Sequence, residues 1–327
     1  MKGMILAAGL GTRLYPLTAF RAKPAVPFLN RPLVQYACDL LLDAHLTEIV
    51  INSHHLPESV RQSLETEAGA KGPQITFSHE EQILGTAGAI GKVRNFLQGD
   101  TFVVCNGKIY FEQELEPVIR FHHDHNNLVT LVVVPHSWQD SYASVRVDDQ
   151  NNITGFQPES PGHPFVFTGV HVLDPQVLEF IPEGPSETVN QLYPRLIQEG
   201  YRVQGFVSDA YWCECSSAGD YLSRSLEVLR RRNLANLVGP EAESSCEAVI
   251  AAPSVHIEGG CLLKNSILWD DVRVGKGSAL SRVIVTQGVF LRPNTRIENA
   301  VVTTQSKKLD HASIVGQPVE DYCIFPL

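Results

Sequence analysis

A glycine-rich loop follows the first apolar segment of the chain and ends in two residues suited to binding phosphate. The stretch LAAGLGTR carries Gly9 and Gly11, with Thr12 and Arg13 directly after them. Glycines permit a sharp turn, and the consecutive amides of such a loop form a concave anion-binding surface. A hydroxyl and a guanidinium add donors for phosphate oxygens. The loop therefore predicts a phosphate-binding site.

A lysine lies shortly after this loop, in the stretch AKPAVPF. Pro24 and Pro27 stiffen the backbone on the carboxyl side of Lys23, so its ammonium can be held at a fixed point. The dinucleotide fingerprint would need a third glycine and an immediate helix, and here Leu14 is followed by Tyr-Pro. A Walker-type loop is also absent from the sequence. We therefore favour a nucleotide-phosphate site of another kind over redox chemistry with a dinucleotide.

A second candidate position follows the apolar run TFVVC, which is typical of a buried strand. Asn106 and Gly107 end the run in a turn, and the cation Lys108 comes next. Ligands of open α/β sheets bind at the carboxyl ends of strands. Lys108 is therefore either a ligand-binding cation or a lysine whose side chain extends into solvent.

The elements that would position these residues alternate between strands and helices over the first two thirds of the chain. This succession predicts an α/β fold with a doubly wound, mostly parallel sheet. A hairpin is expected over residues 142–156 and a charged helix over residues 216–232. Strands are expected at 2–8, 48–53, 74–79, 101–105 and 128–134, and helices at 33–44, 57–68, 87–97 and 112–123.

After about residue 236 the pattern changes to a repeat of seventeen residues. Val255, Val272 and Val289 each open a row of the repeat, and aliphatic residues recur at matching positions within the rows. One inward aliphatic residue per flat side, with Gly, Pro or Asn at the corners, is typical of a β-solenoid coil. We predict a division of the chain into an α/β domain over residues 1–235 and a β-helix over 236–327, with a partial coil at 238–254 and a carboxyl-terminal cap.

Composition excludes several classes of protein. The formal net charge is −10 with no run of Lys or Arg, so a nucleic-acid partner is not expected. No apolar stretch approaches the roughly 20 residues that span a bilayer. The seven cysteines are scattered and odd in number, which argues against a disulfide framework. We predict a cytoplasmic protein without a membrane-spanning segment.

Two further clusters suggest metal binding but are explained more simply. Cys213 and Cys215 alternate as they would in a strand, and no second pair lies at zinc-site spacing. The run His122 to His125 is expected at the end of a helix, where histidines favour the negative end of the dipole. We interpret it as a solvated helix terminus.

The combined string GLGTRLYPLT with AKPAVPF closely resembles the signature of the nucleotidyltransferase family that makes nucleotide sugars. ILGTAGAI resembles the base-contacting segment of that family, and NRPLVQYACDLLLDAHLTEIVIN resembles the stretch between them. The seventeen-residue repeat resembles the left-handed parallel β-helix of mannose-1-phosphate guanylyltransferases and glucose-1-phosphate adenylyltransferases. The resemblance covers nearly the whole chain.

The resemblance implies a reaction in which a sugar 1-phosphate oxygen attacks the α-phosphate of a nucleoside triphosphate and expels pyrophosphate. Such a transfer depends on positioning and charge neutralisation. Arg13 and Lys23 would be the catalytic residues. The family usually holds Mg²⁺ with two aspartates, because hard cations prefer oxygen ligands. The residues implied to contact the nucleotide are Leu6, Ala7, Ala8, Gly9, Gly11, Thr12, Arg13, Gly85, Thr86, Asn106, Gly107 and Lys108.

The sequence departs from the family pattern at the metal and sugar-phosphate positions. Lys108 replaces the first aspartate, and Glu214 replaces the second, which leaves Glu214 as the candidate metal ligand with Glu112 as a helper. Glu159 stands where the family has a lysine for the sugar phosphate. Gly169 ends the turn that corresponds to the sugar-binding turn. The nucleotide half of the signature is intact.

Two interpretations remain open. In the first, the chain is an enzyme in which the ammonium of Lys108 supplies positive charge where Mg²⁺ would sit. In the second, it is a catalytically inactive relative that binds a nucleotide or nucleotide sugar as a sensor or regulatory subunit. In either case the β-helix leaves coil faces uncovered, so we expect a homo-oligomer.

Overall fold

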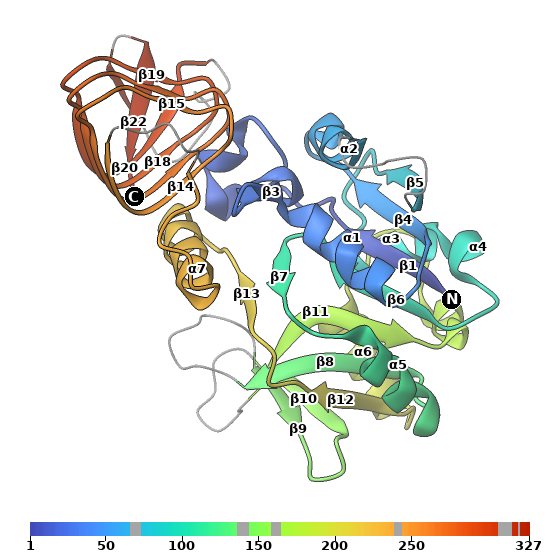
Figure 1. Ribbon diagram of the computed structural model, residues 1–327. Coiled ribbons are helices and arrows are strands. Elements are labelled where there is room, and N and C mark those ends of the chain that lie inside the picture. The colour runs from blue at the N-terminus through green and yellow to red at the C-terminus, as the bar shows by residue number, and fades with distance from the viewer. Residues whose placement is uncertain (66–72, 136–143, 158–164, 239–243, 307–315, 320) are drawn as a thin grey trace. The chain divides into compact units, whose positions relative to one another are not determined.

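A nine-stranded mixed sheet carries the first part of the chain in our computed structural model (Figure 1). The structure describes all residues except 66–72, 136–143, 158–164, 239–243, 307–315 and 320. The strands of this sheet are β1 (Lys2–Leu6), β4 (Glu48–Ser53), β5 (Gln74–His79), β6 (Phe102–Asn106), β8 (Val129–Pro135), β9 (Ser144–Val147), β10 (Ile153–Gln157), β11 (Phe165–Leu173) and β12 (Val203–Val207).

Four neighbouring strands, in the order β6-β1-β4-β5, run parallel to one another. Strands β6, β1 and β4 are largely buried, because helices cover the faces of a parallel sheet, whereas β5 at the edge is partly exposed. Parallel strands place their carboxyl ends at one edge. The ends of β1 and β6, which carry the loop and the turn singled out in the sequence, therefore lie beside each other.

The remaining strands extend the sheet with mixed direction. β11 runs antiparallel to both β6 and β8, whereas β12 is parallel to β8. β9 and β10 pair antiparallel and form the predicted hairpin, of which residues 142 and 143 lie outside the described residues. The predicted α/β fold with a doubly wound, mostly parallel sheet is confirmed, and the antiparallel strand β11 is an addition that the alternating pattern did not indicate.

The helices lie close to their predicted ranges. The segment predicted as one helix over 87–97 is divided in two at Val93, whose φ of −105° and ψ of 20° are not helical. Residues 66–68, the predicted end of the helix over 57–68, lie outside the described residues, and the other differences are a few residues at the helix ends. The helices are α1 (Leu33–Asp43), α2 (Pro57–Glu65), α3 (Gly85–Lys92), α4 (Arg94–Leu97), α5 (Leu115–Asp124), α6 (Tyr193–Gln198) and α7 (Ala218–Arg231).

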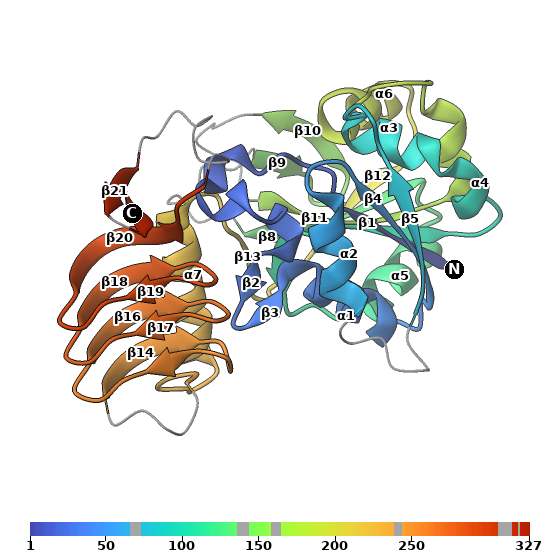
Figure 2. The same ribbon diagram turned by 90° about the horizontal axis from the view of Figure 1, so that it is seen from above.

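The carboxyl-terminal part is a parallel β-helix whose coils stack with the predicted period (Figure 2). Leu263 pairs with Leu280, and Leu280 pairs with Ile297, so the rows align as the sequence indicates. The fold is compatible with a left-handed hexapeptide-type helix. Its long strands are β14 (Ser245–Ala251), β16 (Leu262–Leu268), β18 (Ala279–Val285) and β20 (Arg296–Thr304), and its short strands are β15 (His256–Ile257), β17 (Arg273–Val274) and β19 (Phe290–Leu291).

Further strands lie at both ends of the coil stack, while residues 239–243, 307–315 and 320 of the predicted partial coil and cap lie outside the described residues. β14 supplies the extra coil before the three aligned rows and pairs parallel with β16. At the other end, β22 (Tyr322–Pro326) pairs antiparallel with β20 and also with β21 (Gln317–Val319). Because β22 runs antiparallel to β20, no further parallel coil is added at this end of the stack. β22 thereby covers an edge that would otherwise invite association with another sheet.

The chain forms two compact units, each built from two separate segments. One contains Met1–Leu10 and Leu33–Glu214, and the other contains Gly11–Pro32 and Cys215–Leu327. In the second unit, the hydroxyl of Tyr221 on α7 donates to the carbonyl of Pro27 at 2.5 Å and accepts from Nε1 of Trp269 at 3.1 Å. These contacts join the segment after the glycine-rich loop to α7 and the β-helix. The division into sequence domains after residue 235 stays a prediction.

Candidate functional site

The ends of β1 and β6 bring the first residues of the glycine-rich loop and the Asn-Gly-Lys turn together within the first unit. Leu6 and Asn106 are register partners, and the amide of Gly107 donates to the carbonyl of Leu6 at 2.9 Å. The first residues of the predicted loop therefore start beside the turn. A ligand at this edge of the sheet would meet both segments, as in other open α/β sheets.

A buried polar network lies under the first residues of the loop. The amide of Ala7 donates to Oδ1 of Asn52 at 2.6 Å, and Nδ2 of Asn52 donates to Oε1 of Glu80 at 2.7 Å. Oε2 of Glu80 accepts from the amide of Leu84 at 2.9 Å. Because Glu80 is only 1% exposed, its carboxylate depends on these donors. The network connects the first residues of the glycine-rich loop to the predicted base-contacting segment.

The sequence reasoning missed both side chains of this network. Asn52 lies near the carboxyl end of a strand, and Glu80 directly follows another. Polar residues at such positions in neighbouring parallel strands converge on one edge. This placement at the ends of neighbouring strands is the sequence signal that identifies Asn52 and Glu80.

The base-contacting segment predicted at Gly85 and Thr86 begins helix α3. Gly85 has a φ of +70°, and a Cβ there would lie 2.5 Å from the carbonyl oxygen of Ser186, so only glycine fits. Oγ1 of Thr86 donates to Oε2 of Glu187 at 2.7 Å, and the amide of Thr188 donates to Oγ1 of Thr86 at 2.8 Å. The loop at 186–188 fixes the start of this helix. Glu187 was also not anticipated.

The rest of the glycine-rich loop belongs to the second unit. Gly11 has a φ of +67°, and a Cβ there would lie 3.1 Å from Cβ of Lys23, so the turn brings the loop against the lysine. The hydroxyl of Thr18 donates to the carbonyl of Gly11 at 3.0 Å. Lys23 is 7% exposed, whereas Thr12 and Arg13 are exposed. The structure therefore brings Gly11 and Lys23 together and leaves Arg13 accessible.

The turn after β6 is packed against Gly169, the residue predicted to bind sugar. Gly169 has a φ of +84°, and a Cβ there would lie 2.1 Å from Nδ2 of Asn106. Thr168 and Gly169 lie within β11, where the register shifts, rather than in the predicted turn, and Nε1 of Trp212 in β13 (Trp212–Glu214) donates to the carbonyl of Thr168 at 2.9 Å. Asn106 and Gly169 thus lie side by side. Glu159 lies outside the described residues.

Lys108 forms an ion pair with Glu214. The two-stranded sheet of β7 (Ile109–Phe111) and β13 places Ile109 opposite Glu214. Nζ of Lys108 lies 2.7 Å from Oε1 of Glu214, and their side chains are 35% and 8% exposed. The carboxylate is therefore largely withdrawn from water while the ammonium remains accessible. The two residues that replace the family's aspartates contact each other.

This pairing does not fit a Mg²⁺ site. Magnesium requires near-octahedral oxygen coordination, usually with one or two carboxylates and several waters. Here Oε1 of Glu214 accepts from an ammonium, which would repel a divalent ion at the same place. Oε1 of Glu112, the predicted helper, accepts from the hydroxyl of Tyr110 at 2.7 Å. Within the described part of the chain, no group of three or more His, Cys, Asp or Glu is arranged to hold a metal ion.

Two of the simpler interpretations need correction: Cys215 follows the end of β13 and does not alternate with Cys213 within that strand, and His122 is buried. Cys213 and Cys215 are buried, and Cys213 lies in β13. His122 is not solvated as expected: it is buried at the end of α5, where Nδ1 lies 3.0 Å from Oγ1 of Thr130. Burial lowers the pKa of His122 to about 4, so its ring is neutral near pH 7.

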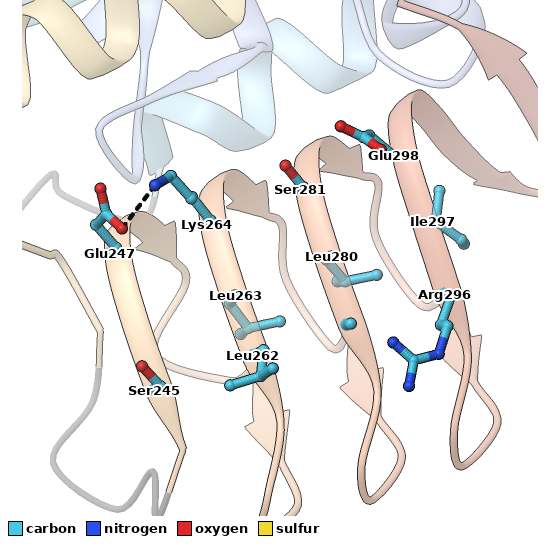
Figure 3. Close-up of a pocket in the computed structure, with 11 residues that line it drawn as sticks. Ser245, Glu247, Leu262, Leu263, Lys264, Leu280, Ser281, Arg296, Ile297 and Glu298 are labelled. Atoms are coloured by element: carbon cyan, nitrogen blue, oxygen red, sulfur yellow. Dashed lines mark ion pairs between the residues drawn. The ribbon is translucent and has the colours of Figure 1, made fainter.

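A groove of about 570 Å³ lies on one face of the β-helix, across β14, β16, β18 and β20 (Figure 3). Leu262 is 60% exposed in it, and Nζ of Lys264 lies 2.9 Å from Oε2 of Glu247. The groove thus combines aliphatic side chains with charges of both signs. Its lining consists of Ser245, Glu247, Leu262, Leu263, Lys264, Ala279, Leu280, Ser281, Arg296, Ile297 and Glu298.

An open α/β sheet with a glycine-rich loop at its carboxyl edge, followed by a β-helix, defines the class of protein. Residues 2–231 match the nucleotidyl transferase family, and residues 241–316 match the GlmU-like C-terminal hexapeptide family. The chain belongs to the nucleotidyl transferase family. The suspected family is therefore confirmed.

Curated relatives align with almost the whole chain. A probable mannose-1-phosphate guanylyltransferase 2 of Oryza sativa is 27% identical over 346 residues, which cover 98% of this chain and 92% of the relative. A UTP–glucose-1-phosphate uridylyltransferase of Synechocystis is 28% identical, with coverage of 95% and 92%. A mannose-1-phosphate guanyltransferase of Pichia angusta is 29% identical, with coverage of 96% and 97%.

Solved structures share the fold of the first part. A putative glucose-1-phosphate thymidylyltransferase from Bacillus anthracis superposes with a TM-score of 0.63 at 21% identity, covering 70% of this chain and 95% of that one. HddC from Yersinia pseudotuberculosis complexed with GMP-PN gives a TM-score of 0.60 at 22% identity, covering 69% and 99%. Separately, no helix in the described residues is long and apolar enough to cross a membrane.

Proposed function

We propose that this protein transfers a nucleotidyl group from a nucleoside triphosphate to a sugar 1-phosphate, giving a nucleotide sugar and pyrophosphate. The observation that carries the proposal is the adjacency of the ends of β1 and β6, where the amide of Gly107 meets the carbonyl of Leu6 at 2.9 Å. Family membership supports it, as do the names of the relatives, which are nucleotidyltransferases acting on mannose 1-phosphate or glucose 1-phosphate.

The glycine pattern of the loop adds support. No described atom lies within 4 Å of a Cβ built on Gly9, so packing inside the protein does not require glycine there. A ligand that approaches the backbone does require it. Gly11, by contrast, needs glycine for its own turn. We assign Gly9 to phosphate contact and Gly11 to the turn that places Lys23.

In the proposed reaction, an oxygen of the sugar 1-phosphate attacks the α-phosphate and the bond to pyrophosphate breaks. The attacking oxygen is already ionised, so the chain needs to supply position and positive charge rather than a base. Lys23 and Arg13 would neutralise the phosphates, and the segment at Gly85 and Thr86 would frame the base. Gly169, packed on Asn106, would lie by the sugar.

A direct test measures pyrophosphate release from GTP, ATP, UTP and dTTP, each with a panel of sugar 1-phosphates. We expect turnover with at least one pair, and a loss of about a hundredfold or more for Lys23→Ala and Arg13→Ala, since charge-neutralising residues of phosphoryl transfer have effects of this size. Lys276→Ala and Arg273→Ala, which remove exposed cations of the β-helix, are the matched controls. Turnover that is unchanged in both loop variants would contradict the proposal.

One observation favours a second candidate, binding of a nucleotide or nucleotide sugar without turnover. Lys108 and Glu214 form an ion pair at the position where the family's metal would be expected. Calorimetric binding of a nucleotide, with no pyrophosphate released from any pair in the panel, would select the sensor role. Absence of nucleotide binding would contradict both.

The proposal includes a homo-oligomer acting in the cytoplasm. All seven cysteines are thiols, which suits a reducing compartment. The groove of Figure 3 carries Lys264 and Arg296 as well as Glu247 and Glu298. A second copy of the same face, turned by a two-fold axis, could pair opposite charges around the exposed Leu262. We therefore propose this face for the contact between copies.

A further inference from the structure

The ion pair at the carboxyl edge of the sheet has a consequence for how phosphate is bound. Lys108 follows β6 directly, in the turn whose Gly107 contacts the end of β1. Glu214 is brought to it by the pairing of β7 with β13. A buried carboxylate therefore holds an ammonium at the edge where the proposed function places the triphosphate.

The pair matches a metal site in net charge but not in chemistry. One ammonium and one carboxylate sum to zero, and a divalent ion between two carboxylates also sums to zero. A fixed ammonium can thus replace the ion without changing the charge that a phosphate meets. It cannot, however, coordinate several oxygens at once, and it repels a divalent ion.

The ammonium also retains the capacity to bind a ligand. It has three donors, and its contact with Oε1 of Glu214 at 2.7 Å uses one of them. The side chain of Lys108 is 35% exposed, whereas that of Glu214 is 8% exposed. Hence the carboxylate orients the ammonium from the protein side, and the remaining donors are accessible from the solvent side.

We infer that this protein binds the phosphates of its nucleotide without a divalent ion, with the ammonium of Lys108, held by Glu214, in the place of that ion. This inference rests on the proposed function, because it concerns the same nucleotide site. It extends that function by stating the metal requirement of the site, which holds whether or not the protein turns its nucleotide over.

The test compares calorimetric binding of GTP, ATP, UTP and dTTP in EDTA with binding in excess Mg²⁺. For the nucleotide that binds best, the two dissociation constants should agree within about threefold, because the charge-assisted contact does not depend on the ion. Lys108→Met should weaken binding about tenfold or more in both buffers. Lys108→Asp should bind poorly in EDTA and recover in Mg²⁺, because it provides a second carboxylate beside Glu214.

Lys2→Asp is the matched control for that reversal of charge. Lys2 lies at the opposite end of β1, its Nζ is 3.7 Å from Oε2 of Glu48, and its side chain is 32% exposed, close to the exposure of Lys108. This variant should bind nucleotide as the unmodified protein does, in both buffers. Circular dichroism of every variant shows whether a loss of binding reflects a loss of folding.

Titration of the nucleotide-free protein with Mn²⁺ also tests the inference. Binding of Mn²⁺ is detected by its paramagnetic resonance spectrum. The unmodified protein should hold no Mn²⁺ at the pair, and Lys108→Asp should gain one bound ion. Nucleotide binding that requires Mg²⁺, or a bound Mn²⁺ that is lost in Glu214→Gln, would overturn the inference and leave the proposed function standing. Nucleotide binding in neither buffer would overturn the proposed function, and the Mn²⁺ titration would still decide the metal question.

Discussion

Nζ of Lys108 lies 2.7 Å from Oε1 of Glu214, with the carboxylate side chain only 8% exposed. The two residues are far apart in the sequence and are joined by the pairing of β7 with β13. A charge pair of this kind affects folding as well as binding, because removing one partner leaves the other charge without compensation in a partly buried place.

We expect Lys108→Met to lower the free energy of unfolding by about 1–3 kcal/mol, since Glu214 would lose a charged partner. Urea denaturation measures this change. The double substitution Lys108→Met with Glu214→Gln should recover part of the loss, because it removes the uncompensated charge. A double substitution whose cost equals the sum of the two single costs would show that the pair is not coupled.

The buried network of Asn52 and Glu80 beneath the glycine-rich loop should contribute to the stability of the fold. Asn52→Ala would leave the amide of Ala7 and a carboxylate oxygen of Glu80 without their contacts, so we expect a loss of about 2–4 kcal/mol. Gln82→Ala, at an exposed position of the neighbouring segment, is the control and should change stability by less than about 0.5 kcal/mol. Equal unfolding midpoints for the two variants would contradict the importance of the network.

Substitutions at two glycines distinguish the cost of a left-handed backbone from the cost of a steric clash. Gly169 has a φ of +84° and Gly184 a φ of +85°, but only Gly169 lacks room, with Asn106 Nδ2 2.1 Å from its Cβ position. Gly184→Ala should cost about 1 kcal/mol for the left-handed backbone alone. Gly169→Ala should cost at least about 2 kcal/mol more, because Asn106 must also move. Thermal unfolding of both variants checks this difference, and similar midpoints would count against it.

Stability should fall between pH 6.5 and pH 4. Burial lowers the pKa of His122 to about 4 and that of His171 to about 3. Both histidines are therefore neutral in the folded protein and become protonated near pH 6.5 only after unfolding. The unfolded state binds more protons in this window, so stability is full above pH 7 and is lost as the pH falls. Each histidine should lower the free energy of unfolding by about 2 kcal/mol at pH 5 relative to pH 8.

Unfolding measured at both pH values tests this account. His171→Phe removes the titrating ring. Between pH 8 and pH 5, the free energy of unfolding of this variant should fall by about 2 kcal/mol less than that of the unmodified protein. His123→Phe is the control, since His123 is exposed. An unchanged pH dependence in His171→Phe would contradict a neutral buried ring.

The exposed aliphatic side chain in the β-helix groove should control association between copies. Leu262 is 60% exposed, and Leu262→Arg would place a charge where the proposed two-fold contact buries a side chain. Light scattering after size exclusion should show an oligomer for the unmodified protein and a smaller species for the variant. Phe290→Arg, at an exposed position of a different strand, β19, is the control. A monomeric unmodified protein would contradict this proposal.

The fold was largely predictable from the sequence because its two periods are strong. Buried strands alternate with amphipathic helices, and the seventeen-residue repeat aligns Leu263 with Leu280 as the structure has them. The direction of β11 was not predictable, because a buried apolar run has the same composition in a parallel or an antiparallel neighbour. The break at Val93 was also missed, since its cause is local backbone geometry rather than composition.

The candidate site was predictable only in part. Local motifs marked the loop at Gly9 and Gly11 and the turn at Lys108, because a turn signal depends on adjacent residues. The contacts that hold them come from distant segments: Asn52, Glu80 and Glu187 are joined to the site by tertiary packing. Contacts between residues this far apart in the chain cannot be predicted from one sequence alone. Likewise, Lys108 and Glu214 were each recognised as departures, but their contact required the structure.

A crystal structure of the protein with a non-hydrolysable nucleoside triphosphate, grown in the presence of Mn²⁺, tests the central claim most directly. We predict the triphosphate at the ends of β1 and β6, with the ammonium of Lys108 within hydrogen-bonding distance of a phosphate oxygen. No anomalous peak for Mn²⁺ should lie at Glu214. A nucleotide bound elsewhere, or a manganese ion between Glu214 and the phosphates with Lys108 turned away, would contradict this account.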